Sequence, residues 1–361
     1  MTKHDLSGSE EMGTNAHRYR KNLLLPFLGL ILGVILLLIA WWIATRPTLE
    51  EELGTFFENE VHPQLAQYSK RNQEAVNRAV ERISIEINEY GEGIPAFVED
   101  VTSLGTKFGV FGRWWKDRWK KGWGNDPVNA THLQEYMSGK FEEHLFSDQD
   151  LKLLIQETLE QFRDDLKANQ NRLHADVTSA WKLQPYAQGD LHLEQVVAEV
   201  DQNIKSLSHK MGTDSLTNGV LAFVGDFVLG GTAGGVANAI IVYVSANLVS
   251  STAFTSAVSG GVIMKLSVAG GAGGSTLGPV GTVVGAAAGI IVGGIADWWM
   301  TKNLEEELTN ECNSLLSQVK AQLLMGTKDA PGLQQAFLES ISILEEAEES
   351  ALRKSIMEVT K

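Results

Sequence analysis

The residue types that carry out catalysis are present in this chain, but their spacing matches no catalytic motif. The eight histidines are scattered, and His144, which follows two glutamates, has no second metal ligand at helical spacing. The glycine-rich stretch 270–278 lacks the lysine of a phosphate-binding loop, and neither an HExxH nor a GxSxG sequence occurs. Carboxylate pairs such as Glu345–Glu346 fit exposed positions of a helix. The sequence therefore predicts a protein that is not an enzyme and binds neither a metal nor a cofactor.

The single cysteine offers no redox chemistry. Cys312 has no partner for an intrachain disulfide and no CxxC neighbour. It lies in a helical row of apolar residues with Leu308 and Leu315. We therefore expect a small core residue rather than a reactive thiol.

The composition excludes further classes of protein. The chain has 361 residues, of which 45 are acidic and 30 are basic, and its net charge is −15. A hydrophobic content of 43% is too high for a wholly disordered chain, and the acidic balance excludes a sequence-wide basic surface for nucleic acid. Glycine is unevenly distributed, because 18 of the 35 glycines lie within 219–294. That stretch contains only two charged residues, Asp226 and Lys265.

An uncharged apolar segment near the N-terminus has the length of a transmembrane helix. Residues 23–44 read LLLPFLGLILGVILLLIAWWIA, which as a helix extends about 33 Å, whereas a hydrocarbon core is roughly 30 Å thick. Trp41 and Trp42 lie where an interfacial aromatic belt is expected. A cleaved signal peptide is the alternative, but its apolar core is normally shorter and ends in a small-residue cleavage site. We predict a retained anchor over 23–45, preceded by a polar leader over 1–22.

Basic residues flank this anchor unevenly. Arg18, Arg20 and Lys21 precede it, whereas Arg46 alone follows it before an acidic run. By the positive-inside rule, this difference predicts a cytoplasmic N-terminus. The bulk of the chain then lies on the far side of the membrane, which is a bacterial inner membrane if the source is a bacterium.

Five runs of apolar residues at steps of three and four predict long amphipathic helices. Because no alternating strand pattern occurs outside the glycine-rich stretch, the predicted fold is all-α. We expect a helical bundle or coiled coil over 48–211, with acidic helices over 301–361 packing on it. The predicted apolar rows comprise Phe57, Val61, Leu65, Tyr68, Val76, Val80, Ile83, Ile87 and Tyr90; Leu151, Ile155, Leu159, Phe162, Leu166, Leu173, Val177 and Trp181; Leu193, Val197, Val200, Ile204, Leu207 and Met211; Leu304, Leu308, Cys312, Leu315, Val319 and Leu323; and Leu333, Phe337, Ile341, Leu344, Leu352 and Ile356.

A cationic, tryptophan-rich segment over 107–124 interrupts this acidic bundle. Five lysines and arginines fall within 113–121, and on a helix the aromatic residues share one face. This pattern is typical of a helix that lies in a bilayer interface and is attracted by anionic headgroups. Packing of the tryptophans in the bundle core is the alternative, and one short patch on an acidic chain argues against nucleic acid. Together with the two tryptophans of the anchor, the candidate membrane-interface residues are Trp41, Trp42, Phe111, Arg113, Trp115, Lys116, Trp119, Lys120 and Trp123.

The region 212–300 is predicted to contain a glycine-rich apolar helical hairpin. Residues 227–264 and 266–296 carry no charge, and glycine recurs every four residues in the second arm. Glycines four apart leave a flat groove on a helix that a second backbone can approach closely. In water each such glycine costs about 1 kcal/mol relative to alanine. The candidate helix-packing residues of this glycine zipper are Gly230, Gly231, Gly234, Gly235, Gly281, Gly285, Gly289 and Gly293.

Three arrangements of this hairpin fit the sequence. In the first, residues 228–248 and 277–299 form a pair of transmembrane helices, since each is about 20 residues long. In the second, the hairpin packs inside a soluble bundle as a sheltered apolar tip or an insertion-competent loop. In the third it forms a β-structured tongue, because residues 240–254 are rich in β-branched side chains.

These features favour a non-enzymatic, membrane-anchored helical protein with a structural or assembly role, whose glycine-zipper hairpin packs in or on a membrane. The expected partners are a lipid bilayer and further copies of the chain in a homo-oligomer, and nucleic acid is not expected. One alternative is a pore-forming or membrane-perturbing protein that oligomerises through the hairpin. A second alternative is a scaffold for a protein partner.

Overall fold

The computed structural model confirms the all-α fold, because its described part is helical apart from loops and one short strand pair. The strands β1 (Gly326–Thr327) and β2 (Ala330–Pro331) pair antiparallel and join two helices. The structure describes residues 30–42, 45–106, 127–185, 191, 193–211, 216–225, 233–251, 283–284, 287–288, 291, 303–327 and 330–358.

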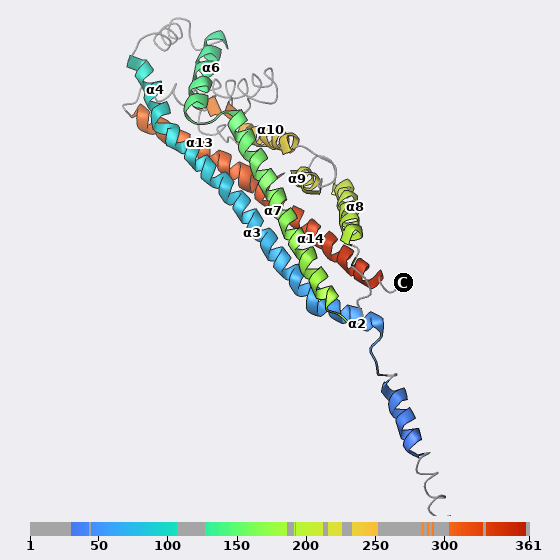
Figure 1. Ribbon diagram of the computed structural model, residues 1–361. Coiled ribbons are helices and arrows are strands. Elements are labelled where there is room, and N and C mark those ends of the chain that lie inside the picture. Colours follow the sequence, from blue (N-terminus) through green and yellow to red (C-terminus); the bar gives the residue numbers. More distant parts are fainter. Residues whose placement is uncertain are drawn as a thin grey trace, which may run out of the picture.

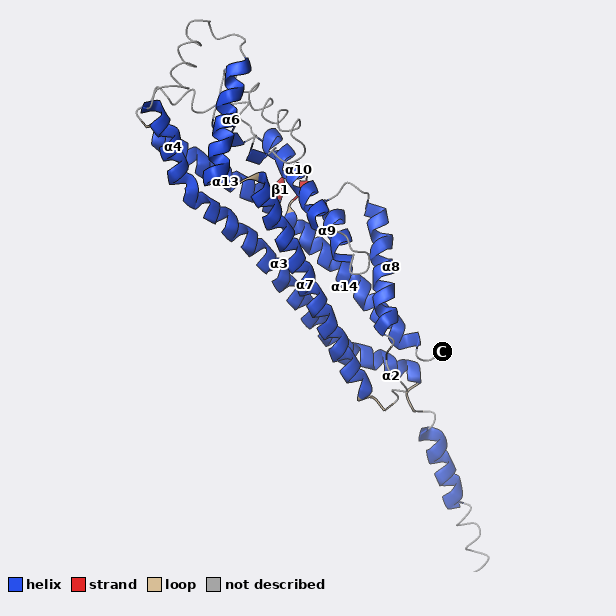
Figure 2. Ribbon diagram, turned by 45° about the horizontal axis from the view of Figure 1, so that its top comes forward, coloured by secondary structure: helices blue, strands red, loops and turns tan. Residues whose placement is uncertain are grey.

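Four long helices make up the body of the molecule: α3 (His62–Tyr90), α7 (Asp148–Lys182), α13 (Leu304–Met325) and α14 (Leu333–Glu358). The helices α3 and α7 pack along one another, and α14 packs against α3. Figures 1 and 2 show that α3 and α7 run along an elongated bundle, whereas α13 lies toward the end that carries α4 and α14 lies toward the end that carries α2. Their buried apolar residues belong to one continuous core.

Shorter helices extend and cover this bundle. The helices α8 and α9 lie on α14, α10 lies on α7 and α13, and α4 contacts α13 and α6. The helix α2 precedes α3, and the 3₁₀ turn η2 connects α3 to α4. Their bounds are α2 (Leu49–Phe56), η2 (Gly91–Gly93), α4 (Ile94–Thr106), α6 (Pro127–His144), α8 (Leu193–Met211), α9 (Leu216–Gly225) and α10 (Ala233–Ser251).

Local sequence explains how the first long helical run begins and changes pitch. Thr48 and Glu51 form a capping box that starts α2, in which each side chain binds the backbone N–H of the other residue. A π-helical turn, η1 (Phe57–Val61), joins α2 to α3 and ends two residues before Pro63. Proline has no N–H and its ring clashes with the carbonyl four residues earlier, so a wider turn at this point lets the chain continue as a helix.

The predicted apolar rows are confirmed in α7 and α14, where every member of both rows is buried. Cys312 is also a core residue as expected, and its burial raises the pKa of the thiol to about 12. In α8 the predicted row is confirmed at Val200 and Ile204 but is wrong at Val197. Val196 is buried with Val200 and Ile204, whereas Val197 is 38% exposed. Steps of four residues along the helix keep Val196 on the packed side, and Val197 is turned away from it.

The two ends of the bundle carry different segments. In Figure 1 the helical residues 30–42 extend away from the bundle beyond α2, and the C-terminus lies near that end. The helices α4 and α6 lie at the opposite, distal end. Among the helices that the structure describes, none combines the length and the apolar character needed to cross a membrane.

Candidate functional site

A layer of polar side chains crosses the core of the bundle. The apolar rows of α3, α7 and α14 each contain one polar residue, four positions after an apolar member, where the next apolar residue is due. Because all three helices pack together, these interruptions meet at one level of the core. The three residues are Asn72, Gln170 and Glu348.

The layer is hydrogen-bonded across all three helices. Glu348 is fully buried, accepts a hydrogen bond of 2.8 Å from Gln170 Nε2, and is bonded through Oε1 to His174 Nε2. Asn72 accepts a hydrogen bond of 3.0 Å from Asn169 Nδ2 and donates one of 3.1 Å to Glu345 Oε1. A buried carboxylate is tolerated only when its oxygens are satisfied in this way.

The environment of this layer raises the pKa of a neighbouring phenol. Tyr68 is buried on α3, and its burial followed by the charge of Glu348 moves its pKa well above the usual range. Glu348 is fully buried and His174 is 7% exposed, so their contact lies inside the core of the bundle. The layer therefore acts on the relative position of the helices, and a double-mutant cycle would measure that contribution.

Sequence reasoning missed this layer, and it placed one of its members wrongly. Glu345 was expected to be exposed, but it is half-buried because it accepts the Asn72 hydrogen bond. Its neighbour Glu346 is exposed as expected. The sequence did contain a signal for the layer: in each of the three helices, the row of apolar residues is interrupted by the polar residue.

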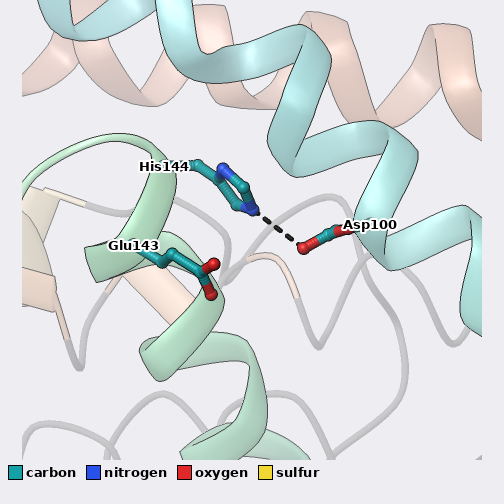
Figure 3. A group of neighbouring side chains, drawn as sticks. All are labelled: Asp100, Glu143 and His144. Atoms are coloured by element: carbon teal, nitrogen blue, oxygen red, sulfur yellow. Dashed lines mark hydrogen bonds and ion pairs between the residues drawn. The ribbon is translucent and has the colours of Figure 1, made fainter.

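A second polar cluster joins α4 to α6 at the distal end. Asp100 Oδ2 lies 2.9 Å from both His144 Nε2 and Lys140 Nζ, and Lys140 Nζ also lies 2.6 Å from Glu143 Oε2. Figure 3 shows the His144 ring and the Asp100 carboxylate pointing toward one another from the two helices. The hydrogen bond from His144, followed by that from Lys140, lowers the pKa of Asp100.

This cluster has the residue types of a metal site but also carries its own cation. Asp100, Glu143 and His144 offer ligand atoms that lie within 4.8 Å of one another. The Lys140 ammonium group already bridges the two carboxylates, and its positive charge opposes a divalent cation at the same place. The arrangement is therefore an ion-pair network. It clamps together the two helices that flank the tryptophan-rich segment.

A close backbone contact strengthens this clamp. A β-carbon at Gly93 would overlap the carbonyl oxygen of His144, so only glycine fits at this position. The rings of Phe97 and Phe141 also meet edge to face, with centroids 6.0 Å apart. The start of α4 is thus fixed against the end of α6.

A groove of about 310 Å³ lies between α3 and α7. Its charged lining residues are all ion-paired. The pairs are Arg78 with Asp165, Arg82 with Glu157, and Asp164 with Arg163. Each charged residue that lines the groove is thus matched by a neighbour of opposite charge.

The two tryptophans predicted at the membrane interface are exposed. Trp41 and Trp42 are 67% and 53% exposed, and both belong to the helical residues 30–42. The Arg46 guanidinium lies 3.5 Å from the centroid of the Trp42 ring, in a cation–π contact. The other candidate interface residues lie outside the described residues: Phe111, Arg113, Trp115, Lys116, Trp119, Lys120 and Trp123.

The two described glycines of the predicted zipper lie on α10. Gly235 is exposed, and Gly234 is half-buried. A β-carbon at Gly234 would meet Gln156 Oε1 at 3.5 Å, which is an ordinary van der Waals contact rather than a close backbone approach. The remaining candidates lie outside the described residues: Gly230, Gly231, Gly281, Gly285, Gly289 and Gly293.

The described part of the glycine-rich region packs on the bundle. The helix α10 turns one face toward α7 and α13, and the buried residues of that face are Ala233, Ala237, Ile240, Ile241 and Val244. The described residues of the second arm are also buried, and a buried carboxylate binds their backbone. Asp148 Oδ1 accepts hydrogen bonds from the N–H groups of Val283 and Val284 at 3.2 and 3.3 Å. No motif in the sequence predicted this contact.

The chain was also compared with models of protein families, with curated proteins and with solved structures. None of the three comparisons finds a match. Its function is therefore inferred from its own residues and their geometry.

Proposed function

We propose that this protein is a membrane-anchored helical stalk with a structural or assembly role. In this proposal the segment 23–45 crosses a bilayer, and the bundle extends from it on the far side. The distal end of the bundle presents the segments that act on a membrane or on further copies of the chain. In a bacterium the membrane is the inner membrane and the N-terminus is cytoplasmic.

The exposure of residues 30–42 on every side is the observation that carries the proposal. Eleven large apolar side chains of this helix are exposed, and they are distributed around its whole circumference. Each such side chain is stabilised by about 1.5–3 kcal/mol when it is buried, so the helix forfeits on the order of 20 kcal/mol in water. A protein partner would cover one face of a helix, whereas lipid covers all faces.

The residues at the end of this helix also suit a membrane boundary. Trp42 and Arg46 form their cation–π pair where the helix ends, and an arginine stacked on tryptophan is stable at the level of lipid headgroups. The capping box at Thr48 starts a new, polar helix only a few residues later. The chain thus passes from an apolar helix to a polar helix within one short junction.

The second candidate function is that of a membrane-perturbing protein that oligomerises through the glycine-rich region. The observation that favours it is the exposed side of α10. Gly235, Ala239 and Val242 face outward at helical spacing, so the exposed side of this uncharged helix is apolar at these three positions. A second apolar surface of this kind suits lipid or another copy of the same helix.

Alkaline carbonate extraction of the full-length protein from membranes tests the anchor. The wild-type chain is expected to stay in the membrane pellet. The double variant Ile35→Arg/Leu36→Arg is expected to move to the supernatant, because each arginine at the centre of a spanning helix costs about 2.5–3.5 kcal/mol.

The matched control is Ile85→Arg, which places the same charge at an exposed apolar position of α3. This variant is expected to stay in the pellet with the wild type. Release of the wild-type chain, or equal release of both variants, would contradict the anchor.

A further inference from the structure

Two described residues in the second arm of the glycine-rich region bind a carboxylate from another helix. The backbone N–H groups of Val283 and Val284 both point to Oδ1 of Asp148, at 3.2 and 3.3 Å. A buried backbone N–H group needs a hydrogen-bond acceptor, and for these two residues a side-chain oxygen supplies it. Asp148 supplies it from the first turn of α7, more than one hundred residues earlier in the chain.

Asp148 is not needed to start its own helix. The cap of α7 is formed by Ser147 and Asp150, whose side chains each bind the backbone N–H of the other residue. Asp148 is instead 3% exposed, although it lies in the first turn of a helix, where acidic residues are normally solvated. Because Ser147 and Asp150 form the cap, Oδ1 of Asp148 is available for the contact with the second arm.

The contact holds an apolar face in the core. The described residues of the arm recur at steps of one and three, which places them on one side of a helix, and all are buried in the continuous core. Four of the five side chains are valine or alanine, so each contributes little buried area, and the arm carries no charge that would fix it in water. The residues are Val283, Val284, Ala287, Ala288 and Ile291.

We infer that Asp148 is a latch that keeps the described residues of the second glycine-rich arm docked on the bundle, and that loss of this contact frees these residues for lipid. The inference rests on the proposed membrane role of the distal end. In the docked state the carboxylate satisfies the N–H groups of the arm. In the released state, water and headgroup phosphates at the bilayer surface take over that role.

Cysteine accessibility in the full-length protein tests the latch. Ala288→Cys in a Cys312→Ser background places a single small thiol on the buried face of the arm. With a water-soluble maleimide we expect slow labelling of this thiol. The further substitution Asp148→Ala is expected to speed labelling roughly 10- to 100-fold, because two hydrogen bonds to a charged group are lost. The amide of Asp148→Asn still accepts hydrogen bonds, so this variant is expected to lie between the two.

Two controls separate the latch from general destabilisation. Asp150→Ala removes the cap of α7 from the same turn but leaves the contact with the arm, and it is expected to leave labelling of the thiol introduced at position 288 unchanged. Cys312 in the otherwise unchanged chain is buried on α13 and reports opening of the bundle itself. Asp148→Ala is expected to leave the labelling of Cys312 slow.

Equal labelling rates in Asp148→Ala and Asp150→Ala would overturn the latch, as would an equal acceleration at Cys312. An environment-sensitive dye on the thiol introduced at position 288, measured with vesicles containing one-quarter anionic lipid, then tests the second step. A blue shift in the Asp148→Ala variant supports release into lipid. Faster labelling without a blue shift supports the docking contact, overturns release into lipid and counts against the membrane role of the distal end.

Discussion

Residues 30–42 and α10 are both helical, apolar and uncharged, but they differ in what surrounds their side chains. The first helix stands apart from the bundle, and its leucines, isoleucines and tryptophans are exposed on all sides. The helix α10 buries one face against α7 and α13 and exposes the other. Two apolar helices of the same chain therefore have different surroundings: one is exposed on all sides, and the other is packed along one face.

The size of the side chains explains the difference. The buried face of α10 contains alanines at its start, which let its backbone come near α7, and isoleucines and valine farther along fill the remaining space. Residues 30–42 carry large side chains at every position except Gly33 and Ala40, and these large side chains are exposed. A helix face that mixes small and large residues packs well against a protein surface. A helix with large side chains over most of its surface is better suited to lipid.

The largest expected effect comes from placing a charge in each segment. Ile240→Asp puts a carboxylate at a fully buried position of α10 and is expected to destabilise the bundle by at least about 4 kcal/mol. Leu36→Asp puts the same charge on the exposed helix, so the unfolding of the bundle is expected to stay unchanged. Urea unfolding in detergent micelles, followed by circular dichroism, measures both. Equal shifts would show that the two segments do not differ as described.

A smaller effect is expected from added volume. Ala237 is fully buried on α10, and Ala237→Leu is expected to cost about 1–3 kcal/mol through overpacking. A β-carbon at Gly33 meets no heavy atom within 4 Å, so Gly33→Leu is expected to leave the stability of the bundle unchanged. The same unfolding measurement applies. A tolerated leucine at 237 would argue against tight packing of α10.

Alanine in place of Gly234 is expected to be mildly stabilising. The new β-carbon has room beside Gln156, and helix propensity favours alanine by up to about 1 kcal/mol. Gly93→Ala serves as the contrasting control, because its β-carbon would overlap the His144 carbonyl. The mass of the protein by light scattering is measured in parallel. A lower oligomeric state of Gly234→Ala would show that this glycine packs against a second copy, as the glycine zipper predicts.

The smallest effect is expected on the outward side of α10. Val242 is 45% exposed, and Val242→Ser is expected to change the free energy of unfolding by no more than about 0.5 kcal/mol. Val244→Ser, two residues farther on at a fully buried position, should cost clearly more. A large effect at Val242 would reveal that this side of α10 is covered in solution.

The sequence predicted the parts of the structure that depend on local periodicity. Spacings of three and four residues identified α7 and α14 and their buried rows, because a helix returns to the same face at that interval. The same reasoning failed by one position at Val197, where a neighbouring valine competes for the packed side. Uncharged length likewise identified the candidate anchor without any information about its surroundings.

Only the tertiary structure decided which polar residues meet in the core and which segments lie against one another. Asn72, Gln170 and Glu348 read as separate gaps in three rows, and they form one polar layer because α3, α7 and α14 pack in a particular register. Asp148 reads as an ordinary first-turn acid of α7, and it becomes a buried contact because Val283 and Val284 lie against it. Periodicity is a property of neighbouring residues, whereas register and docking depend on contacts between residues that are far apart in the chain. For that reason the sequence determined the helices of this protein and their apolar faces, and the packed structure determined where its polar groups act.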